Sequence, residues 1–301
     1  MIKNRLFGLR NKYSNGLDTR LIVMFKEQDM IIKYLIKHRG VNFSGYNIST
    51  IEHQLGQRLN NTHTGTIPKY LEYIKSHPDE LNHLIDALII NVSSFFRDPL
   101  VFNYISSKIF PKILLEKKAS GNPSLRIWSA GCAAGEEPYS LAMETSLLVK
   151  DITTNFTVDI FATDIDKGSI DKARKSTYKK ESLNNVRYKH LKCFIQKADT
   201  FSLKQDIKQL VNFSSYDLLD KNTFSPPESL YGGFDMVLCR NVLIYYNTEH
   251  QNRILTKLFR SLNENGYLVL GETEVPTRRF HDSFKRVTDC CQIYMKNSIG
   301  T

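Results

Sequence analysis

The 301-residue sequence lacks the features that mark membrane proteins and secreted proteins. No run approaches the roughly 20 consecutive apolar residues that a membrane-spanning helix needs. The first eight residues, MIKNRLFG, lack the apolar core of a signal peptide. The five cysteines include no spaced CxxC pair, and the adjacent Cys290 and Cys291 are poorly placed to bond to each other or to clasp zinc. These absences predict a reducing, cytoplasmic compartment, no membrane insertion and no metal site.

Internal repeats and low-complexity tracts are also absent, and apolar and charged residues occur at frequencies ordinary for a globular protein. The net charge of +10 indicates an acidic partner only weakly. A solvated helix face explains most basic runs, and an acidic protein surface or nucleic acid are the alternatives. The basic residues concentrate in one stretch: Lys167, Lys172, Arg174, Lys175, Lys179, Lys180, Arg187, Lys189 and Lys192.

The first third of the chain has a helical pattern. Residues 1–20 are polar and are expected to be flexible. Residues 21–90 form the predicted helical domain, in which apolar residues from Ile48 to Leu59 recur at spacings of three and four, with Asn47 as the N-cap. Pro78 opens a second such helix. Residues 91–122 are predicted to be a linker and a connecting helix that starts at Pro99.

From residue 123 to residue 298 the pattern changes to strands that alternate with helices. The expected strands are 126–129, 156–163, 234–239 and 267–270, which are rich in β-branched and apolar residues. Such alternation predicts a doubly wound, mostly parallel sheet with right-handed crossovers. Residues 193–213 read instead as a small β hairpin with a turn near Asp199, inserted into this α/β domain.

A glycine-containing loop, from Gly131 to Gly135, follows the first expected strand. Glycine permits a tight turn and a close approach of a ligand to the backbone, although many such loops are merely turns. The loop is not G-x-G-x-x-G, and no Lys or Arg nearby could bind a pyrophosphate. It runs into Glu136 and Glu137, whose carboxylates suit a ligand that carries an ammonium and a sulfonium.

Two further polar positions follow strands. Asp164 ends the second strand, where an acid can accept hydrogen bonds from ribose hydroxyls, and Asp166 is the better N-cap for the next helix. Arg240 and Asn241 interrupt an apolar run where doubly wound sheets bind ligands. Ribose binding without pyrophosphate binding favours S-adenosylmethionine over NAD.

At these residues the sequence resembles the chemotaxis-receptor glutamate methyltransferases, the CheR-type family. The resemblance spans about residues 25–296 and is specific, because five long motifs occur in the family's order. These motifs are NVSSFFRDP (91–99), RIWSAGCAAGEEPYSL (126–141), FATDID (161–166), FSSYDLL (213–219) and CRNVLIYY (239–246).

The resemblance implies a small all-α domain packed on a Rossmann-like methyltransferase domain, with the hairpin as a docking subdomain. It implies S-adenosyl-L-methionine as the cofactor and S-adenosyl-L-homocysteine as the product. Arg97 and Tyr245 are the candidate catalytic residues near the transferred methyl group. Ser93 and Asp217 stand where the family commonly has Thr and Asn. The implied cofactor-binding residues are Asn91, Ser93, Arg97, Gly131, Glu137, Asp164, Asp217, Leu218, Arg240 and Asn241.

The resemblance also implies a partner, namely the cytoplasmic helices of methyl-accepting chemotaxis receptors, whose glutamates are methylated. Neither a Ser/His/Asp triad nor a metal is needed, because a glutamate is already an anion at neutral pH. The family's arginine-rich receptor-contact segment corresponds to residues 51–60, which contain a single arginine. Either the basic stretch from Lys167 to Lys192 supplies the positive charge for this contact, or the substrate differs from an ordinary chemoreceptor.

Two other functions stay open at this point. The basic balance is compatible with a nucleic-acid methyltransferase, although Arg240-Asn241-Val242-Leu243 replaces the Asn/Asp-Pro-Pro-aromatic motif of amino-directed DNA enzymes. A non-catalytic sensor that binds adenosylmethionine is the second alternative, and the presence of Arg97 and Tyr245 argues mildly against it. We expect a monomer that does not bind nucleic acid.

Overall fold

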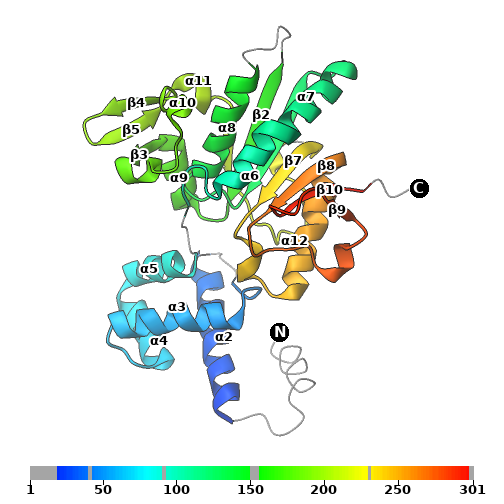
Figure 1. Ribbon diagram of the computed structural model, residues 1–301. Coiled ribbons are helices and arrows are strands. Elements are labelled where there is room, and N and C mark those ends of the chain that lie inside the picture. Colours follow the sequence, from blue (N-terminus) through cyan, green and yellow to red (C-terminus); the bar gives the residue numbers. More distant parts are fainter. Residues whose placement is uncertain (1–18, 40–42, 90–92, 150–155, 230–231, 298–301) are drawn as a thin grey trace. The chain divides into compact units, whose positions relative to one another are not determined.

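The computed structural model describes residues 19–39, 43–89, 93–149, 156–229 and 232–297, with side chains from residue 26 onward. Two compact units emerge (Figure 1). One comprises residues 1–90 together with 245–247, and the other comprises residues 91–244 and 248–301. Among the described residues, no helix is both long enough and apolar enough to cross a membrane.

The first unit is helical. Ile51, Leu55 and Leu84 of the two predicted helices are buried in its core, so the apolar residues of these helices do face inward. Tyr70, on a helix that was not predicted, is also fully buried. Asn47 precedes its helix in an extended conformation but its side chain makes no capping hydrogen bond. The helices are α2 (Thr19–Arg39), α3 (Ile48–Asn61), α4 (Ile67–Ser76) and α5 (Pro78–Leu88).

A buried carboxylate ties three of these helices together. Glu80 of α5 accepts two hydrogen bonds from the Arg58 guanidinium of α3, at 2.9 and 2.6 Å, and one from the Tyr70 hydroxyl of α4 at 2.6 Å. Burial alone would raise the pKa of Glu80, but the hydrogen bonds from Arg58 and Tyr70 hold that pKa below its usual value. The single arginine of the 51–60 segment is therefore engaged inside the unit.

Replacing Glu80 is expected to destabilise the protein. Glu80→Gln leaves a partly buried guanidinium without its counter-charge, which costs about 3 kcal/mol or more at neutral pH. Because the lowered pKa stabilises the fold only while Glu80 is ionised, the difference from wild type should shrink as the pH falls below about 4. Urea unfolding of wild type and of Glu80→Gln at a series of pH values measures this difference in the free energy of unfolding.

Glu72→Gln on the neighbouring helix is the matched control, because Glu72 pairs with Lys75 in an exposed position. Its effect should stay within about 0.5 kcal/mol. Equal losses for the two substitutions would contradict the role assigned to Glu80.

The second unit is built on a seven-stranded sheet with the order β6-β2-β1-β7-β8-β10-β9. β6, β2, β1, β7 and β8 are parallel, and β10 runs antiparallel to β8 and β9. The order reverses between β1 and β7, so the predicted doubly wound, mostly parallel sheet is present. The strands are β1 (Ser124–Ala130), β2 (Thr157–Asp164), β6 (Val211–Ser215), β7 (Phe234–Cys239), β8 (Leu262–Leu270), β9 (Phe284–Arg286) and β10 (Ile293–Lys296).

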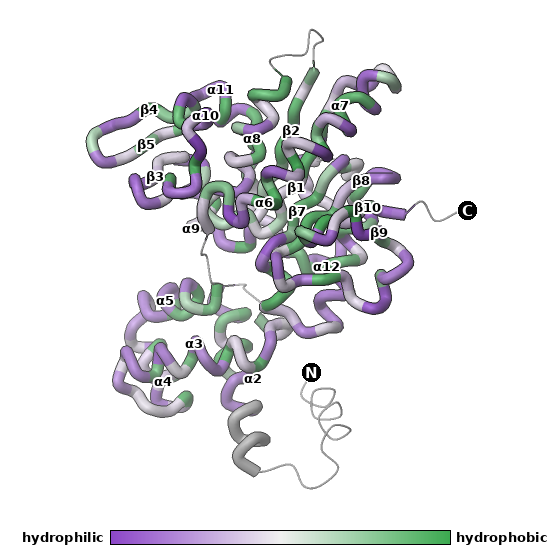
Figure 2. Tube along the Cα trace, in the orientation of Figure 1, coloured by the Kyte–Doolittle hydropathy of each residue, from purple (hydrophilic) through white to green (hydrophobic). Residues whose placement is uncertain are grey.

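Helices cover both faces of this sheet. Ile127 of β1 belongs to a core that includes Phe102 and Phe110, whereas the next residue, Trp128, contacts the rings of Tyr216 and Phe234. Figure 2 accordingly shows the central strands as hydrophobic along much of their length, as buried parallel strands require. The helices are α6 (Pro99–Tyr104), α7 (Phe110–Ala119), α8 (Glu136–Val149), α9 (Lys167–Lys175) and α12 (Thr248–Ser261).

The connecting helix begins at Pro99 as predicted, but it is not regular. A π-helical turn, η1 (Ile105–Ile109), separates α6 from α7. Pro111 follows in the first turn of α7, where its missing N–H would break a regular α-helical hydrogen bond. A sequence pattern of apolar residues does not reveal such a local change of pitch.

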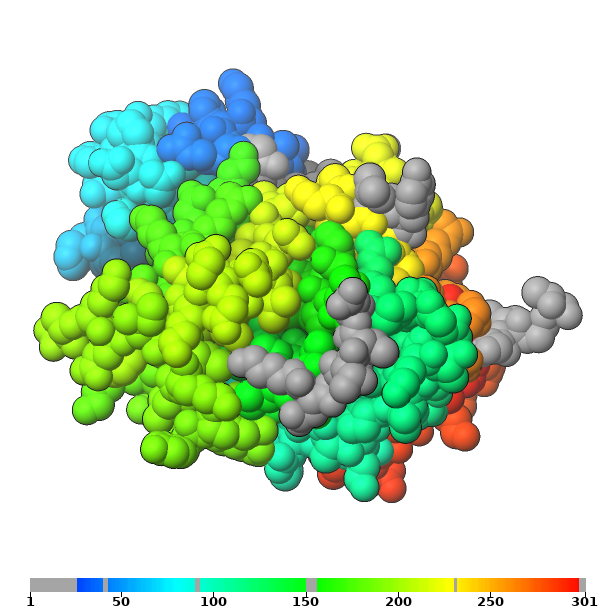
Figure 3. Space-filling model, turned by 90° about the horizontal axis from the view of Figure 1, so that it is seen from above, coloured from blue at the N-terminus to red at the C-terminus, as the bar shows by residue number. Residues whose placement is uncertain are grey.

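The small β insertion is a three-stranded antiparallel sheet, β3-β5-β4, that protrudes from the second unit (Figure 3). β4 (Phe194–Lys197) and β5 (Thr200–Leu203) form the predicted hairpin, with Ala198 in a left-handed conformation at its turn. β3 (Thr177–Lys179) was not predicted, because three residues carry too little pattern. Val211–Ser215 pairs with β2, so the end of the expected 193–213 segment lies in the main sheet instead.

Candidate cofactor site

The carboxyl edge of the parallel strands gathers most of the predicted cofactor-binding residues. Gly131 follows β1, Asp164 ends β2, and Arg240 follows β7. Asp217 and Leu218 come just after β6, where the Tyr216 N–H donates to the Asp164 carbonyl at 2.9 Å. Adjacent parallel strands end side by side, so these positions share one edge at the point where the strand order reverses.

The glycine loop is fastened to the end of β2. The N–H groups of Gly131 and Cys132 donate to the Thr163 carbonyl at 2.8 and 2.9 Å. Gly131 has a φ of +83°, and a Cβ there would collide with the side chain of Val242. The loops after β1 and β7 therefore pack directly on each other, and only glycine fits at position 131.

Asp164 is held in a fixed orientation. One carboxylate oxygen accepts the Ala133 N–H at 2.9 Å and the other accepts the Asp166 N–H at 3.0 Å. Burial raises the pKa of Asp164, and these backbone hydrogen bonds oppose the rise. Asp166, as predicted, caps α9 through the N–H groups of Gly168 and Ser169. A carboxylate offers about four acceptor positions, so these hydrogen bonds leave lone-pair capacity to which a ligand hydroxyl can donate.

Arg240 lies behind this edge, with only 2% of its side chain exposed. Its guanidinium donates to Glu137 at 3.1 Å, to Asp98 at 2.5 Å and to the Arg97 carbonyl at 3.0 Å. The second oxygen of Glu137 accepts from the Ser129 hydroxyl at 2.8 Å. Arg240 thus fixes Glu137 and the linker segment, and no described residue accepts a hydrogen bond from its buried Nε.

Aromatic contacts hold the linker that carries Arg97. Phe95 packs edge-on against Tyr178 and Phe194 of the insertion. Phe96 stacks on His190 at 4.5 Å, and its N–H donates to the Ser140 hydroxyl at 3.0 Å. Phe96 and Asp98 both have a positive φ, a conformation that non-glycine residues hold only when their surroundings enforce it.

Ser93 contacts a different acid from the one predicted to bind the cofactor. Its side chain is hydrogen-bonded to Glu136, and the burial of Glu136 raises the pKa of that carboxyl despite the bond. One oxygen of Glu136 is buried and has no hydrogen-bond partner among the residues that the structure describes. Asn91 lies outside the described residues.

Glu274 organises the loop after β7 and was missed by the sequence analysis. This buried carboxylate accepts the N–H groups of Gly271 at 2.7 Å, Asn241 at 2.8 Å and Ile244 at 3.2 Å. A Cβ at Gly271 would approach the Glu274 carboxylate to 2.7 Å. The sequence did offer one signal for Glu274, because an acidic residue follows the end of β8 closely, at the same edge of the sheet.

Lys257 of α12 plays the corresponding role for the turn after β6. Its ammonium donates to the Tyr216 hydroxyl at 2.7 Å and to the carbonyls of Asp220 and Asp217 at 2.8 and 3.4 Å. Asp217 in turn accepts the Leu219 N–H at 2.8 Å. Burial lowers the pKa of Lys257 to about 8, although Asp220 and Asp217 oppose the decrease.

Tyr245 belongs to the other unit. Its carbonyl accepts the Asn47 N–H at 2.7 Å, and its ring stacks on Tyr46 with centroids 6.2 Å apart. Arg97 belongs to the α/β unit. A joint catalytic role for these two residues therefore stays a prediction.

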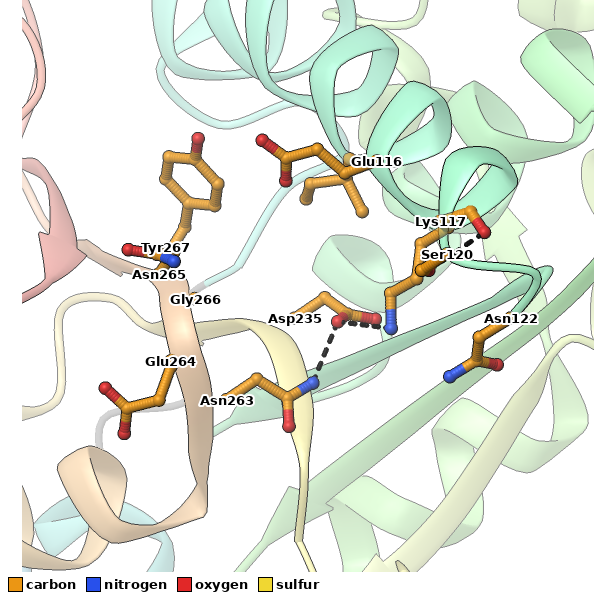
Figure 4. Close-up of a pocket in the computed structure, with 11 residues that line it drawn as sticks. Glu116, Lys117, Ser120, Asn122, Asp235, Asn263, Glu264, Asn265, Gly266 and Tyr267 are labelled. Carbon is orange, nitrogen blue, oxygen red and sulfur yellow. Dashed lines mark hydrogen bonds and ion pairs between the residues drawn. The ribbon is translucent and has the colours of Figure 1, made fainter. Parts of the chain in front are cut away.

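A polar hollow of about 260 Å³ lies at the opposite, amino end of β7 (Figure 4). There Lys117 and Asn263 both point to Asp235, with distances of 2.7 and 2.9 Å. Asp235 also accepts the Arg126 N–H at 3.0 Å. Since its main polar groups are paired with one another and lie far from the strand ends described above, we assign this hollow a structural role.

The donor set at the carboxyl edge fits a cationic sulfur nucleoside. Asp164 accepts a hydrogen bond from the glycine loop at Ala133, Glu137 follows that loop in the first turn of α8, and no lysine or arginine stands in the loop. These features, on a seven-stranded sheet that reverses between β1 and β7, define a Rossmann-like S-adenosylmethionine-dependent methyltransferase.

The SAM-binding domain of the CheR methyltransferases matches residues 91–290, and the all-alpha domain of the same family matches residues 26–89. The chain therefore belongs to the CheR methyltransferase family. A chemotaxis protein methyltransferase of Borreliella burgdorferi is 31% identical over 88% of this chain and 93% of its own. One of Listeria monocytogenes is 30% identical over 69% and 74%, respectively.

Glu274→Gln is expected to weaken binding of S-adenosylhomocysteine about tenfold. An amide offers one acceptor oxygen in place of two, so at least one of the three N–H groups loses its partner and the loop relaxes. Calorimetric titration measures the affinity. The exposed neighbour Glu272→Gln is the control, and equal affinities for the two variants would rule out the organising role.

The stability of the protein should rise between pH 8 and pH 10 through Lys257. Because an unfolded lysine titrates near 10.4, the unfolded state holds more protons than the folded state in this interval. Urea unfolding should therefore show wild type gaining stability relative to Lys257→Met as the pH increases. Lys221→Met, in the same turn but exposed, serves as the control; parallel pH profiles for wild type and Lys257→Met would refute the assignment.

Proposed function

We propose that this protein transfers the methyl group of S-adenosylmethionine to glutamate side chains of a chemotaxis receptor, which yields glutamate methyl esters and S-adenosylhomocysteine. The observation that carries the proposal is that both domains of the CheR family match in order over residues 26–290. The relatives from Borreliella and Listeria, which bear the name chemotaxis protein methyltransferase, support the chemotaxis role.

Within this proposal the carboxyl edge binds the cofactor. Asp164 is the ribose acceptor, supported by its fixed orientation and its remaining lone pairs. Asp217 and Leu218 border the adenine, on the turn that Lys257 holds. Glu137 faces the cationic amino-acid portion, and Arg240 supports it from behind. The remaining proposed contacts are Asn91, Ser93, Arg97, Gly131 and Asn241.

The proposed reaction makes little use of general acid–base catalysis. S-adenosylmethionine supplies a methyl group that its sulfonium already activates. The accepting glutamate is an anion at neutral pH, so the protein need not remove a proton. What the residues contribute is alignment of oxygen, carbon and sulfur and partial removal of water, and positioning of this kind is worth roughly 7–11 kcal/mol in favourable cases.

Arg97 is the proposed orienting residue for the accepting carboxylate, and Tyr245 the proposed residue beside the methyl group. The support for Arg97 is its anchoring: its carbonyl is bound by Arg240, and its N–H donates to the Ser94 carbonyl at 3.3 Å. Phe95 and Phe96 hold the same segment on the insertion and on α8. A cation so placed can pair with a carboxylate in a fixed geometry.

Receptor recognition requires positive charge outside α3. Arg58, the only arginine of residues 51–60, is paired with Glu80. The basic stretch instead presents exposed lysines on α9 and the insertion, including Lys172, Lys179 and Lys180. We therefore assign the electrostatic contact with the acidic receptor surface to these lysines.

Arg97→Ala should lower the methyl transfer rate at least about 100-fold, because alignment of the acceptor is lost. The assay uses radiolabelled S-adenosylmethionine and receptor-containing membranes, followed by alkali, which releases methanol from esters but leaves N-methyl groups in place. Arg253→Ala on the exposed face of α12 is the control and should keep full turnover.

Full turnover by Arg97→Ala would remove the orienting role from Arg97. Alkali-stable label, or label transferred to DNA with a steep dependence on salt, would overturn the proposed substrate.

A further inference from the structure

Two thiols meet in the turn between β9 and β10. The Sγ atoms of Cys290 and Cys291 are 3.5 Å apart, although adjacent cysteines were predicted to be poorly placed to bond to each other. Cys290 is exposed and Cys291 is buried. The Thr288 hydroxyl oxygen lies 3.1 Å from the Cys290 sulfur.

The other three cysteines differ from this pair in their surroundings. Cys132, Cys193 and Cys239 are all buried, and burial raises the pKa of Cys132 and of Cys239 well above the usual value. At Cys290 the hydrogen bonds with Thr288 and Cys291 lower the pKa of the thiol. An exposed thiol with an increased thiolate fraction is the site at which oxidants react first.

We propose that Cys290 and Cys291 form a reversible oxidation site for hydroperoxides. The Cys290 thiolate attacks the peroxide, the O–O bond breaks, and Cys290 becomes a sulfenic acid while the alcohol or water leaves. The Cys291 thiol then attacks that sulfur, an S–S bond forms, and water leaves. In total, two thiols and one hydroperoxide give one disulfide, one alcohol (or water) and one water.

The geometry favours a labile bond over a structural one. Adjacent Cα atoms are about 3.8 Å apart across a trans peptide, which is shorter than the separation that disulfides prefer. A disulfide under such strain is more easily reduced than a relaxed one. In a reducing compartment the bond therefore persists only while the oxidant does.

The pair is connected to the carboxyl edge of the sheet. Cys291 lies within electrostatic reach of Arg240 and Asp98. The next residue, Gln292, accepts the Leu270 N–H at 2.9 Å, and Leu270 leads into the segment that places Glu274. Closing a strained ring in this turn shifts the backbone on which that segment depends. Oxidation is thus expected to weaken cofactor binding.

The first test is chemical and does not depend on the proposed function. The full-length protein is treated with hydrogen peroxide, the remaining thiols are alkylated, and the 287–296 region is analysed by mass spectrometry. The expected product has lost two hydrogens, carries no alkyl group on either cysteine, and returns to the dithiol with dithiothreitol.

Two variants separate the steps. Cys291→Ser should stop at a sulfenic acid on residue 290 that dimedone traps, and Cys290→Ser should remain unmodified at the same peroxide concentration. A wild-type protein in which both thiols stay alkylatable, or in which Cys290 joins two chains, would overturn the proposal.

The second test measures S-adenosylhomocysteine affinity before and after oxidation. We expect the dissociation constant to increase about threefold or more in wild type and to stay constant in Cys290→Ser treated in the same way. Disulfide formation without a change in affinity would overturn the connection to the pocket, and absence of binding by the reduced protein would overturn the cofactor site itself.

Discussion

Arg240 lies with its guanidinium between the carboxylates of Asp98 and Glu137, almost out of contact with water. Three chain segments meet there: the linker, the first turn of α8 and the loop after β7. Removing two carboxylates and a guanidinium from water is costly, so a cluster of this kind contributes little net stability but permits few alternative arrangements. Its effect is to fix where the linker runs past the sheet edge. The strained backbone at Phe96, Asp98 and Asn241 is compatible with that constraint, because residues in such conformations persist only where their surroundings determine them.

The helical unit also has a buried charge that joins separate elements, but there the central group is a carboxylate and not a guanidinium. There one carboxylate, Glu80, joins a guanidinium and a phenol from two other helices. In both units a buried charge is surrounded by partners from separate elements, and the apolar core fills the remaining space. The consequence differs, however. At the sheet edge the charge orders the loops of the proposed cofactor site, whereas in the helical unit it engages Arg58, the single arginine of residues 51–60.

The sequence was sufficient to predict the architecture and to identify several polar residues that lie at the carboxyl edge of the sheet. Apolar runs and glycine turns predicted the central strands, and Asp164, Arg240 and Asn241 stood out because polar residues interrupted those runs. Glu274 and Lys257 were not found, since they act on backbone groups of loops that are distant in the sequence, and no periodicity encodes such pairings. The ion-pair partners of Arg240 and Arg58 could not be predicted from the sequence for the same reason. The π-helical turn at Ile105 and the three-residue strand β3 were too short to leave a pattern.

The strand order also has a consequence for biosynthesis. β1 and β7 are neighbours in the sheet, yet more than a hundred residues separate them along the chain. When the ribosome has made β1, α8, β2 and β6, half of the edge exists, but Arg240 and Glu274 have not yet been translated. Contacts between distant residues form slowly, and unpaired strand edges are exposed in the meantime. The proposed cofactor site is therefore complete only after Glu274 has been translated, so the cofactor can stabilise the finished α/β domain but cannot guide its early folding.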